Sequence, residues 1–149
     1  MKKLFAVFLL VALLFSCSSA SYASLGFTSD MALTMLEKNY QDSDKIVFTF
    51  TYNKDDDTYF AFVTMKDIIE MAKAYRSGKL EKTGWENIRS SMVDVSVSID
   101  NLLAAMIDDD AYHVLLAITD PSDEDATVVL AMYDGEVIID SVEDVKNGL

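Results

Sequence analysis

The sequence predicts an α+β fold in which helices pack on one face of an antiparallel sheet of about five strands. The first observation is a run from Thr83 to Ile107 whose apolar residues recur at steps of three and four, along a helix of about seven turns. The second is the order of periodic segments, α-ββ-αα-βββ-α, which groups strands apart from helices, as in α+β layer folds. We therefore expect the long central helix 83–107 to bury one apolar seam, formed by Trp85, Ile88, Met92, Val95, Ile99, Leu102 and Met106.

The middle of this run also fits a strand. From Val93 to Ile99 every second residue is apolar and β-branched, which favours a strand locally. The three-four spacing, however, continues on both sides of this patch. Thr83 also stands three residues before Glu86, the spacing of a capping box at a helix start. These two observations favour the helix.

A helix and a β-hairpin are predicted first in the folded part of the chain. Ser29 can cap a helix that ends at a break over residues 41–44. Residues 45–52 and 58–64 read as strands, and the loop between them is short enough to make them a hairpin.

A second helix follows the hairpin. Thr64 has Asp67 three residues later and is expected to cap this helix, which Gly78 would end. The long helix is expected to end at residues 108–110, because three carboxylates there oppose the helix dipole.

The last part of the chain is predicted to add three strands and a short helix. Residues 112–119 are apolar on both faces apart from His113, which is typical of a central strand. Asp134-Gly135 is a strong two-residue turn signal and predicts a hairpin over residues 127–140. Ser141 is expected to cap a final helix.

The first 23 residues have the layout of a bacterial secretory signal. Two lysines precede twelve apolar residues, and a stretch of small residues follows. Twelve apolar residues are too few for a stable membrane-spanning helix. We therefore expect residues 1–23 to be a signal peptide and residues 24–149 to form a single globular α+β domain.

Two cleavage sites compete in this leader. The sequence Leu14-Phe15-Ser16-Cys17 resembles the lipobox of bacterial lipoproteins, and the resemblance implies that residues 1–16 are removed and Cys17 is lipidated. Ser21-Tyr22-Ala23 is a small-x-small site that predicts cleavage before Ser24 instead. The expected location is periplasmic, secreted or membrane-anchored, and a lipid on Cys17 would be the protein's only contact with a membrane.

The composition is strongly acidic. The whole chain has a formal charge of −13, and loss of two leader lysines leaves ten basic against 25 acidic residues, or −15. Such a surface repels phosphates, so we expect no nucleic-acid partner. The charge can serve solubility alone, and the alternative is that it matches a basic protein or peptide. Cys17 is the only cysteine, which excludes an internal disulfide from the mature fold.

Acidic loops are the candidate interaction residues. The clusters considered for contact with a partner are Asp55, Asp56 and Asp57, and Asp123, Glu124 and Asp125. Calcium binding to such oxygen-rich loops is a second alternative function, although no cluster has the spacing of an EF-hand loop. We expect no cofactor and assign no metal ligand.

Enzymatic chemistry has little support in the sequence. His113 is the only histidine, and no glycine pattern of a nucleophile elbow flanks a serine. A small envelope hydrolase using His113 or a carboxylate pair is kept as the alternative function, with no catalytic residue assigned. The aromatic residues of the first hairpin could also line a ligand groove, although a core position is favoured; they are Phe48, Phe50, Tyr52, Phe60 and Phe62.

The leading expectation is a small acidic envelope protein, secreted or lipid-anchored, that acts as a non-enzymatic protein- or peptide-binding module. It would bind its partner through acidic loops or an exposed sheet edge.

Overall fold

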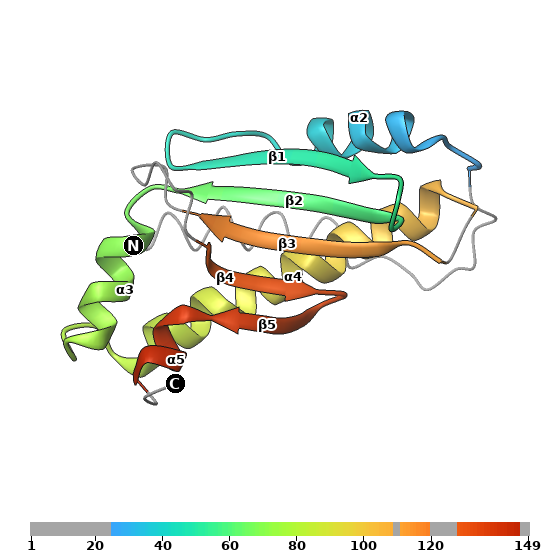
Figure 1. Cartoon of the computed structure of the whole chain (residues 1–149). Helices are drawn as coiled ribbons and strands as arrows, with labels where there is room; N and C mark the ends of the chain where they lie inside the picture. The colour runs from blue at the N-terminus through green and yellow to red at the C-terminus, as the bar shows by residue number, and fades with distance from the viewer. Residues whose placement is uncertain (1–24, 109–110, 120–127, 147–149) are drawn as a thin grey trace.

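A computed structural model describes residues 25–108, 111–119 and 128–146. In chain order the elements are α2 (Ser29–Asn39), β1 (Ile46–Asn53), β2 (Thr58–Met65), α3 (Ile68–Arg76), α4 (Lys82–Met106), β3 (His113–Thr119), β4 (Val128–Tyr133), β5 (Glu136–Asp140) and α5 (Ser141–Lys146). This order matches the predicted α-ββ-αα-βββ-α arrangement, and the fold belongs to the α+β class (Figure 1).

The five strands form one sheet in the order β1-β2-β3-β4-β5. Three of the four strand pairs are antiparallel, but β2 and β3 are parallel. The prediction of an antiparallel sheet was therefore wrong at this pair, and the sheet is mixed. The chain leaves the end of β2, crosses through α3 and α4, and enters β3 at the end of the sheet where β2 begins.

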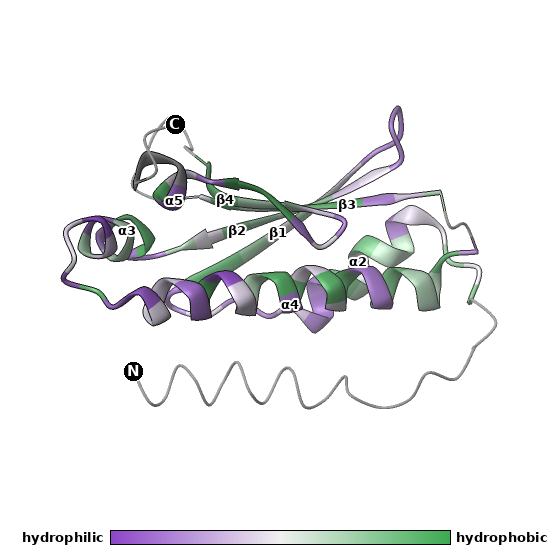
Figure 2. Cartoon of the chain, turned by 90° about the horizontal axis from the view of Figure 1, so that it is seen from below, coloured by the Kyte–Doolittle hydropathy of each residue, from purple (hydrophilic) through white to green (hydrophobic). Residues whose placement is uncertain are grey.

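The helices occupy one face and one end of this sheet. Figure 2 shows α4 running along one face with α2 on the same side, while no helix of the described chain lies over the middle of the opposite face. The remaining helices, α3 and α5, lie together at the end of the sheet where β2 finishes (Figure 1). The packed core therefore lies mainly between α4 and the sheet.

The long helix α4 confirms the main sequence prediction, including the helical state of Val93 to Ile99. Most of the predicted seam is buried, but Leu103 replaces Leu102 at the C-terminal end. The predicted cap was wrong: Thr83 lies inside the helix, and the N-cap is Glu81, whose side chain makes no capping hydrogen bond. The apolar periodicity thus predicts this helix better than the capping pattern does.

The capping residues of α3 and α2 also differ from the predicted ones. Thr64 is part of β2, and α3 begins only after Asp67, which has a left-handed φ of 70° and no capping side-chain hydrogen bond. In α2 the cap is Thr28 rather than Ser29, with its hydroxyl accepting the backbone N–H of Met31 at 3.4 Å. Helix existence was predicted correctly in both cases, and only the first residue was wrong.

The Asp134-Gly135 turn confirms its prediction. It joins β4 to β5 by two residues, with Tyr133 paired to Glu136 across the hairpin. Both turn residues have positive φ, 49° and 79°, as a type I′ turn requires. Glycine adopts this conformation without a steric penalty, so the sequence signal and the backbone agree.

Within the described ranges, no helix is long and apolar enough to span a membrane.

Candidate functional site

The two faces of the sheet differ in what covers them. On the first face, strand residues such as Val63, Leu116 and Met132 are fully buried in the core beneath α4. Their neighbours along the strands point to the other side, where Val47, Phe62 and Ile139 are 40%, 37% and 38% exposed. We call this second surface the open face; it comprises Val47, Thr49, Thr51, Phe60, Phe62, Thr64, Leu115, Ala117, Thr119, Val128, Ala131, Tyr133, Glu136 and Ile139.

The strand register arranges the open face in rows across the sheet. One row runs from Thr51 through Phe60 and Leu115 to Tyr133. The next row runs from Thr49 through Phe62, Ala117 and Ala131 to Ile139. Phe60 and Phe62 stack with ring centroids 5.9 Å apart. The centre of the open face is therefore apolar, with two alanines side by side between larger residues.

One end of the open face is acidic. The turn between β1 and β2 carries Asp55, Asp56 and Asp57, and the turn between β4 and β5 carries Asp134 at the same end of the sheet. The ring of Tyr133 stacks on His113 at 5.1 Å. Desolvation raises the pKa of Tyr133 above its usual value, and the carboxylates of Asp134 and Asp56 raise it further.

His113 lies at the start of β3 and is bound to Asp134. Its Nδ1 is 2.8 Å from Asp134 Oδ2, and both side chains are 44% exposed. Asp134 Oδ1 also accepts the backbone N–H of Val114 at 2.8 Å. Both carboxylate oxygens thus hold the β4–β5 turn against β3. The described residues place no serine hydroxyl on His113, so the arrangement supplies a histidine and an acid without a nucleophile.

The structure describes only half of the predicted interaction residues. Asp55, Asp56 and Asp57 lie at the acidic end, where Asp57 Oδ1 accepts a short hydrogen bond from the hydroxyl of Tyr52. Asp123, Glu124 and Asp125 lie outside the described residues, as does Cys17. Among the residues that the structure describes, no three His, Cys, Asp or Glu side chains are placed so as to hold a metal ion.

The predicted aromatic groove does not form, because its residues divide between the two faces. Phe50 pairs with Ala61 across the hairpin, so Phe48, Phe50 and Tyr52 face the helices while Phe60 and Phe62 face the open side. Phe48 and Phe50 instead pack around Tyr40 at the end of α2, with ring centroids 5.2 and 5.6 Å from it. The core interpretation is correct for these residues.

The outer edge of β1 is partly occupied by the chain itself. Asp42 Oδ1 accepts the backbone N–H of Phe48 at 2.9 Å, and Ser43 Oγ accepts that of Ile46 at 3.1 Å. The Ile46 carbonyl accepts the backbone N–H of Ser43 at 2.8 Å. A partner strand therefore finds the first half of this edge already hydrogen-bonded.

The opposite edge, β5, is also poorly suited to strand addition. The strand has only five residues, and the register shifts between Ala131 and Met132 where β4 pairs with it. Short and irregular edge strands resist pairing with another chain. The open face is thus a better candidate surface than either edge.

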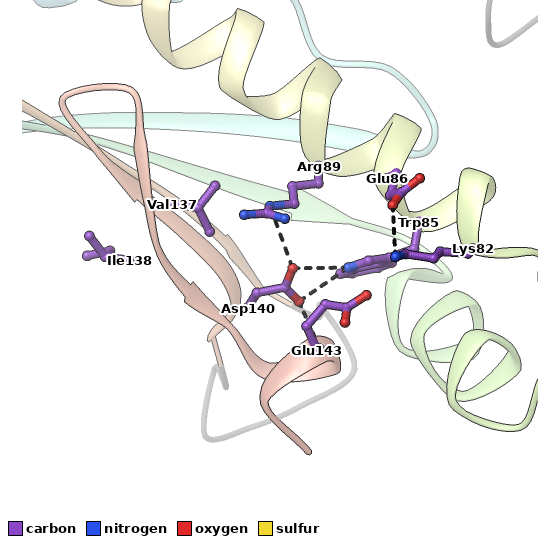
Figure 3. Close-up of a pocket in the computed structure, with 8 residues that line it drawn as sticks. All are labelled: Lys82, Trp85, Glu86, Arg89, Val137, Ile138, Asp140 and Glu143. Carbon is purple, nitrogen blue, oxygen red and sulfur yellow. Dashed lines mark hydrogen bonds and ion pairs between the residues drawn. The ribbon is translucent and has the colours of Figure 1, made fainter. Parts of the chain in front are cut away.

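A second candidate is a hollow between the start of α4, β5 and α5 (Figure 3). Its volume is about 370 Å³. Acidic, basic and apolar residues line it; they are Lys82, Trp85, Glu86, Arg89, Val137, Ile138, Asp140 and Glu143.

Asp140 is the central group of this hollow, and the chain's own donors engage it. Trp85 Nε1 lies 3.2 and 3.3 Å from its two oxygens, and the backbone N–H of Glu143 donates to Oδ1 at 3.1 Å. Arg89 Nε lies 3.8 Å from Oδ2 (Figure 3). This buried carboxylate joins α4 to β5 and caps α5, so its role is structural.

Comparison with known proteins adds no identity to this geometry: no family model, no curated protein and no solved structure matches the chain.

The open face was not among the sites predicted from the sequence, although one signal pointed to it. Residues 112–119 are apolar on both faces, and such strands are normally covered on both sides. In the structure, Leu116 is fully buried beneath α4, whereas Leu115 on the opposite side is half-buried with no described helix over it.

Proposed function

We propose that the protein is a non-enzymatic binding module of the bacterial cell envelope, and that it holds a basic protein segment on its open face. The single observation that carries this proposal is the partly exposed apolar surface around Phe60, Phe62 and Leu115, over which no described helix lies. Adjoining apolar residues on a surface are typical of interaction sites, whereas scattered ones are not.

Charge supports a basic occupant over a second copy of the chain. The mature chain carries a formal charge of −15, so two copies repel each other. The open face itself is nearly uncharged, but Asp55, Asp56 and Asp134 border one end of it. A partner with apolar side chains and a cationic end complements both parts of this surface.

The test is a co-purification from envelope extract with the tagged mature protein and two matched variants. Phe62→Ser removes an apolar side chain from the open face, and Met31→Ser removes a similarly exposed one (49%) from α2. We expect one basic protein to be retained by the wild type and by Met31→Ser, to elute at raised salt, and to be lost with Phe62→Ser. The same retained proteins with all three forms would contradict the proposal.

Export and lipidation are part of the same proposal. Because the mature chain is acidic and lacks a predicted span, several acyl chains on Cys17 would be needed to hold it at a membrane. We expect the processed protein in the membrane fraction, and Cys17→Ser to make it soluble or leave it unprocessed. A soluble mature protein that begins at Ser24 in both forms would contradict lipidation but not export.

A further inference from the structure

We infer that the segment held on the open face is an amphipathic helix, which completes a three-layer arrangement with α4 on the other side of the sheet. This inference rests on the proposed function, since it names the kind of partner that the same surface receives. Three observations carry it: the sheet edges that disfavour an added strand, the larger apolar residues of the open face and the acidic end.

The parallel pair β2–β3 lies at the centre of the sheet, with seven residues of each strand in register from Thr58 and His113. Sheets built wholly of parallel strands have helices on both faces, whereas a mixed sheet such as this one can leave one face open. Here α4 covers one face, and the side chains of Phe60, Phe62 and Leu115 on the other have no helix of the described chain above them.

The sheet edges disfavour the main competing mode of peptide binding. An added strand needs a continuous row of free backbone groups at a sheet edge. Asp42 and Ser43 occupy that row at the start of β1, and β5 is short and irregular. A partner that uses the face instead of an edge must satisfy its own backbone hydrogen bonds, which a helix does internally.

Two alanines lie between larger apolar residues at the centre of the open face. Ala117 and Ala131 are paired on adjacent strands, and each is only 2% exposed. Phe62 and Ile139 lie beyond them on either side in the same row and are 37% and 38% exposed. A ridge of apolar side chains on a bound helix would therefore contact these two larger residues rather than the alanines.

The acidic end of the open face favours a bound helix that carries basic side chains. The carboxylates of Asp55, Asp56 and Asp134 stand at the end of the sheet where β2 and β3 begin. Lysine or arginine side chains on the polar side of the bound helix reach these turns, while its apolar side faces Phe60 and Leu115.

The test uses designed peptides as probes and the chain from Ser24 to Leu149, which contains every described helix and strand. One 18-residue peptide has leucines at helical three-four spacing with lysines elsewhere. A second has the same composition in strict alternation, and a third has the helical spacing with glutamate in place of lysine. Binding is measured by fluorescence anisotropy, and the site is mapped by amide chemical shifts.

We expect the helical lysine peptide to bind at least tenfold more tightly than either control peptide, with shifts centred on Phe62 and Ile139. Phe62→Ser should weaken this binding at least tenfold, and Met31→Ser should leave it within twofold. Thermal melting of both variants confirms that they are folded.

The possible results distinguish a partner that is not helical from a binding surface that is not the open face. Tighter binding of the alternating peptide to the same residues would overturn the helix and leave the open face as the binding surface. Binding that is unchanged by Phe62→Ser, or shifts confined to other surfaces, would overturn the proposed function as well. A chain that sediments as a dimer and becomes monomeric on Phe62→Ser would show that a second copy is the occupant.

Discussion

Val63 and Phe62 are neighbours in the same strand, yet one is fully buried and the other is 37% exposed. The difference is not one of hydrophobicity, since both residues are apolar. It arises because α4 supplies a second layer for one face of the sheet, and no described element supplies a layer for the other. Burial on one face contributes to folding, and the apolar surface left on the other is available for binding.

The largest loss of stability is expected from a charge introduced on the covered face. Val63→Asp would place a carboxylate without a partner beneath α4, and we expect it to destabilise the fold by about 4 kcal/mol or more. Urea unfolding followed by circular dichroism measures this. A Val63→Asp variant with the wild-type urea midpoint would mean that this face of the sheet is not buried beneath α4.

A buried tyrosine on the covered side should lower the stability of the fold at alkaline pH. The hydroxyl of Tyr40 is buried against Phe48 and Phe50 without a partner among the described residues, and this burial raises its pKa to about 12. Between about pH 10 and pH 12 the unfolded chain loses this proton while the folded chain keeps it. Stability therefore falls across that window by roughly 2 kcal/mol, and the group contributes no pH dependence below it.

Tyr40→Phe sharpens this test. It removes the unpaired hydroxyl, so we expect about 1 kcal/mol greater stability at neutral pH and a smaller loss between pH 10 and pH 12. Urea midpoints of wild type and variant at several pH values give the difference directly. Two curves that stay parallel up to pH 12 would contradict the assignment.

A substitution in the β4–β5 turn tests whether this turn is strained and packs closely against α4. Gly135 has a φ of 79°, and a Cβ there would lie 3.2 Å from Val97 Cγ2 on α4. Gly135→Val should therefore cost about 1–2 kcal/mol, through backbone strain and this close contact. Gly135→Asn is the matched control and should cost less, because asparagine adopts left-handed conformations more readily. Equal melting temperatures for Gly135→Val and wild type would rule out the strained turn.

The smallest effect is expected on the open face. Phe62→Asp puts the same charge one residue away from Val63→Asp, but on the side where water can hydrate it. We expect a loss of about 1 kcal/mol or less, from reduced contact with Phe60. The pair of variants gives a direct measure of the asymmetry. If Phe62→Asp unfolded the protein as Val63→Asp does, the open face would have to be covered in the isolated chain.

Local patterns were sufficient for the elements and for part of the candidate site. Seven turns of three-four spacing outweigh a short alternating patch from Val93 to Ile99, because the spacing extends over the whole helix. Asp134-Gly135 fits its turn because few other residues adopt positive φ at both positions. The sequence also shows that β3 is apolar on both faces, but not which face α4 covers.

Only the tertiary structure decided how these elements meet. β3 pairs with β2, which makes the pair parallel, whereas pairing with β1 would have made it antiparallel, and no residue pattern within a strand encodes that choice. Leu103 is buried in place of Leu102, and the hairpin register places Phe60 and Phe62 on the face opposite Phe48 and Phe50. Periodicity depends on contacts between near neighbours in the chain, whereas strand order and face depend on packing between distant segments.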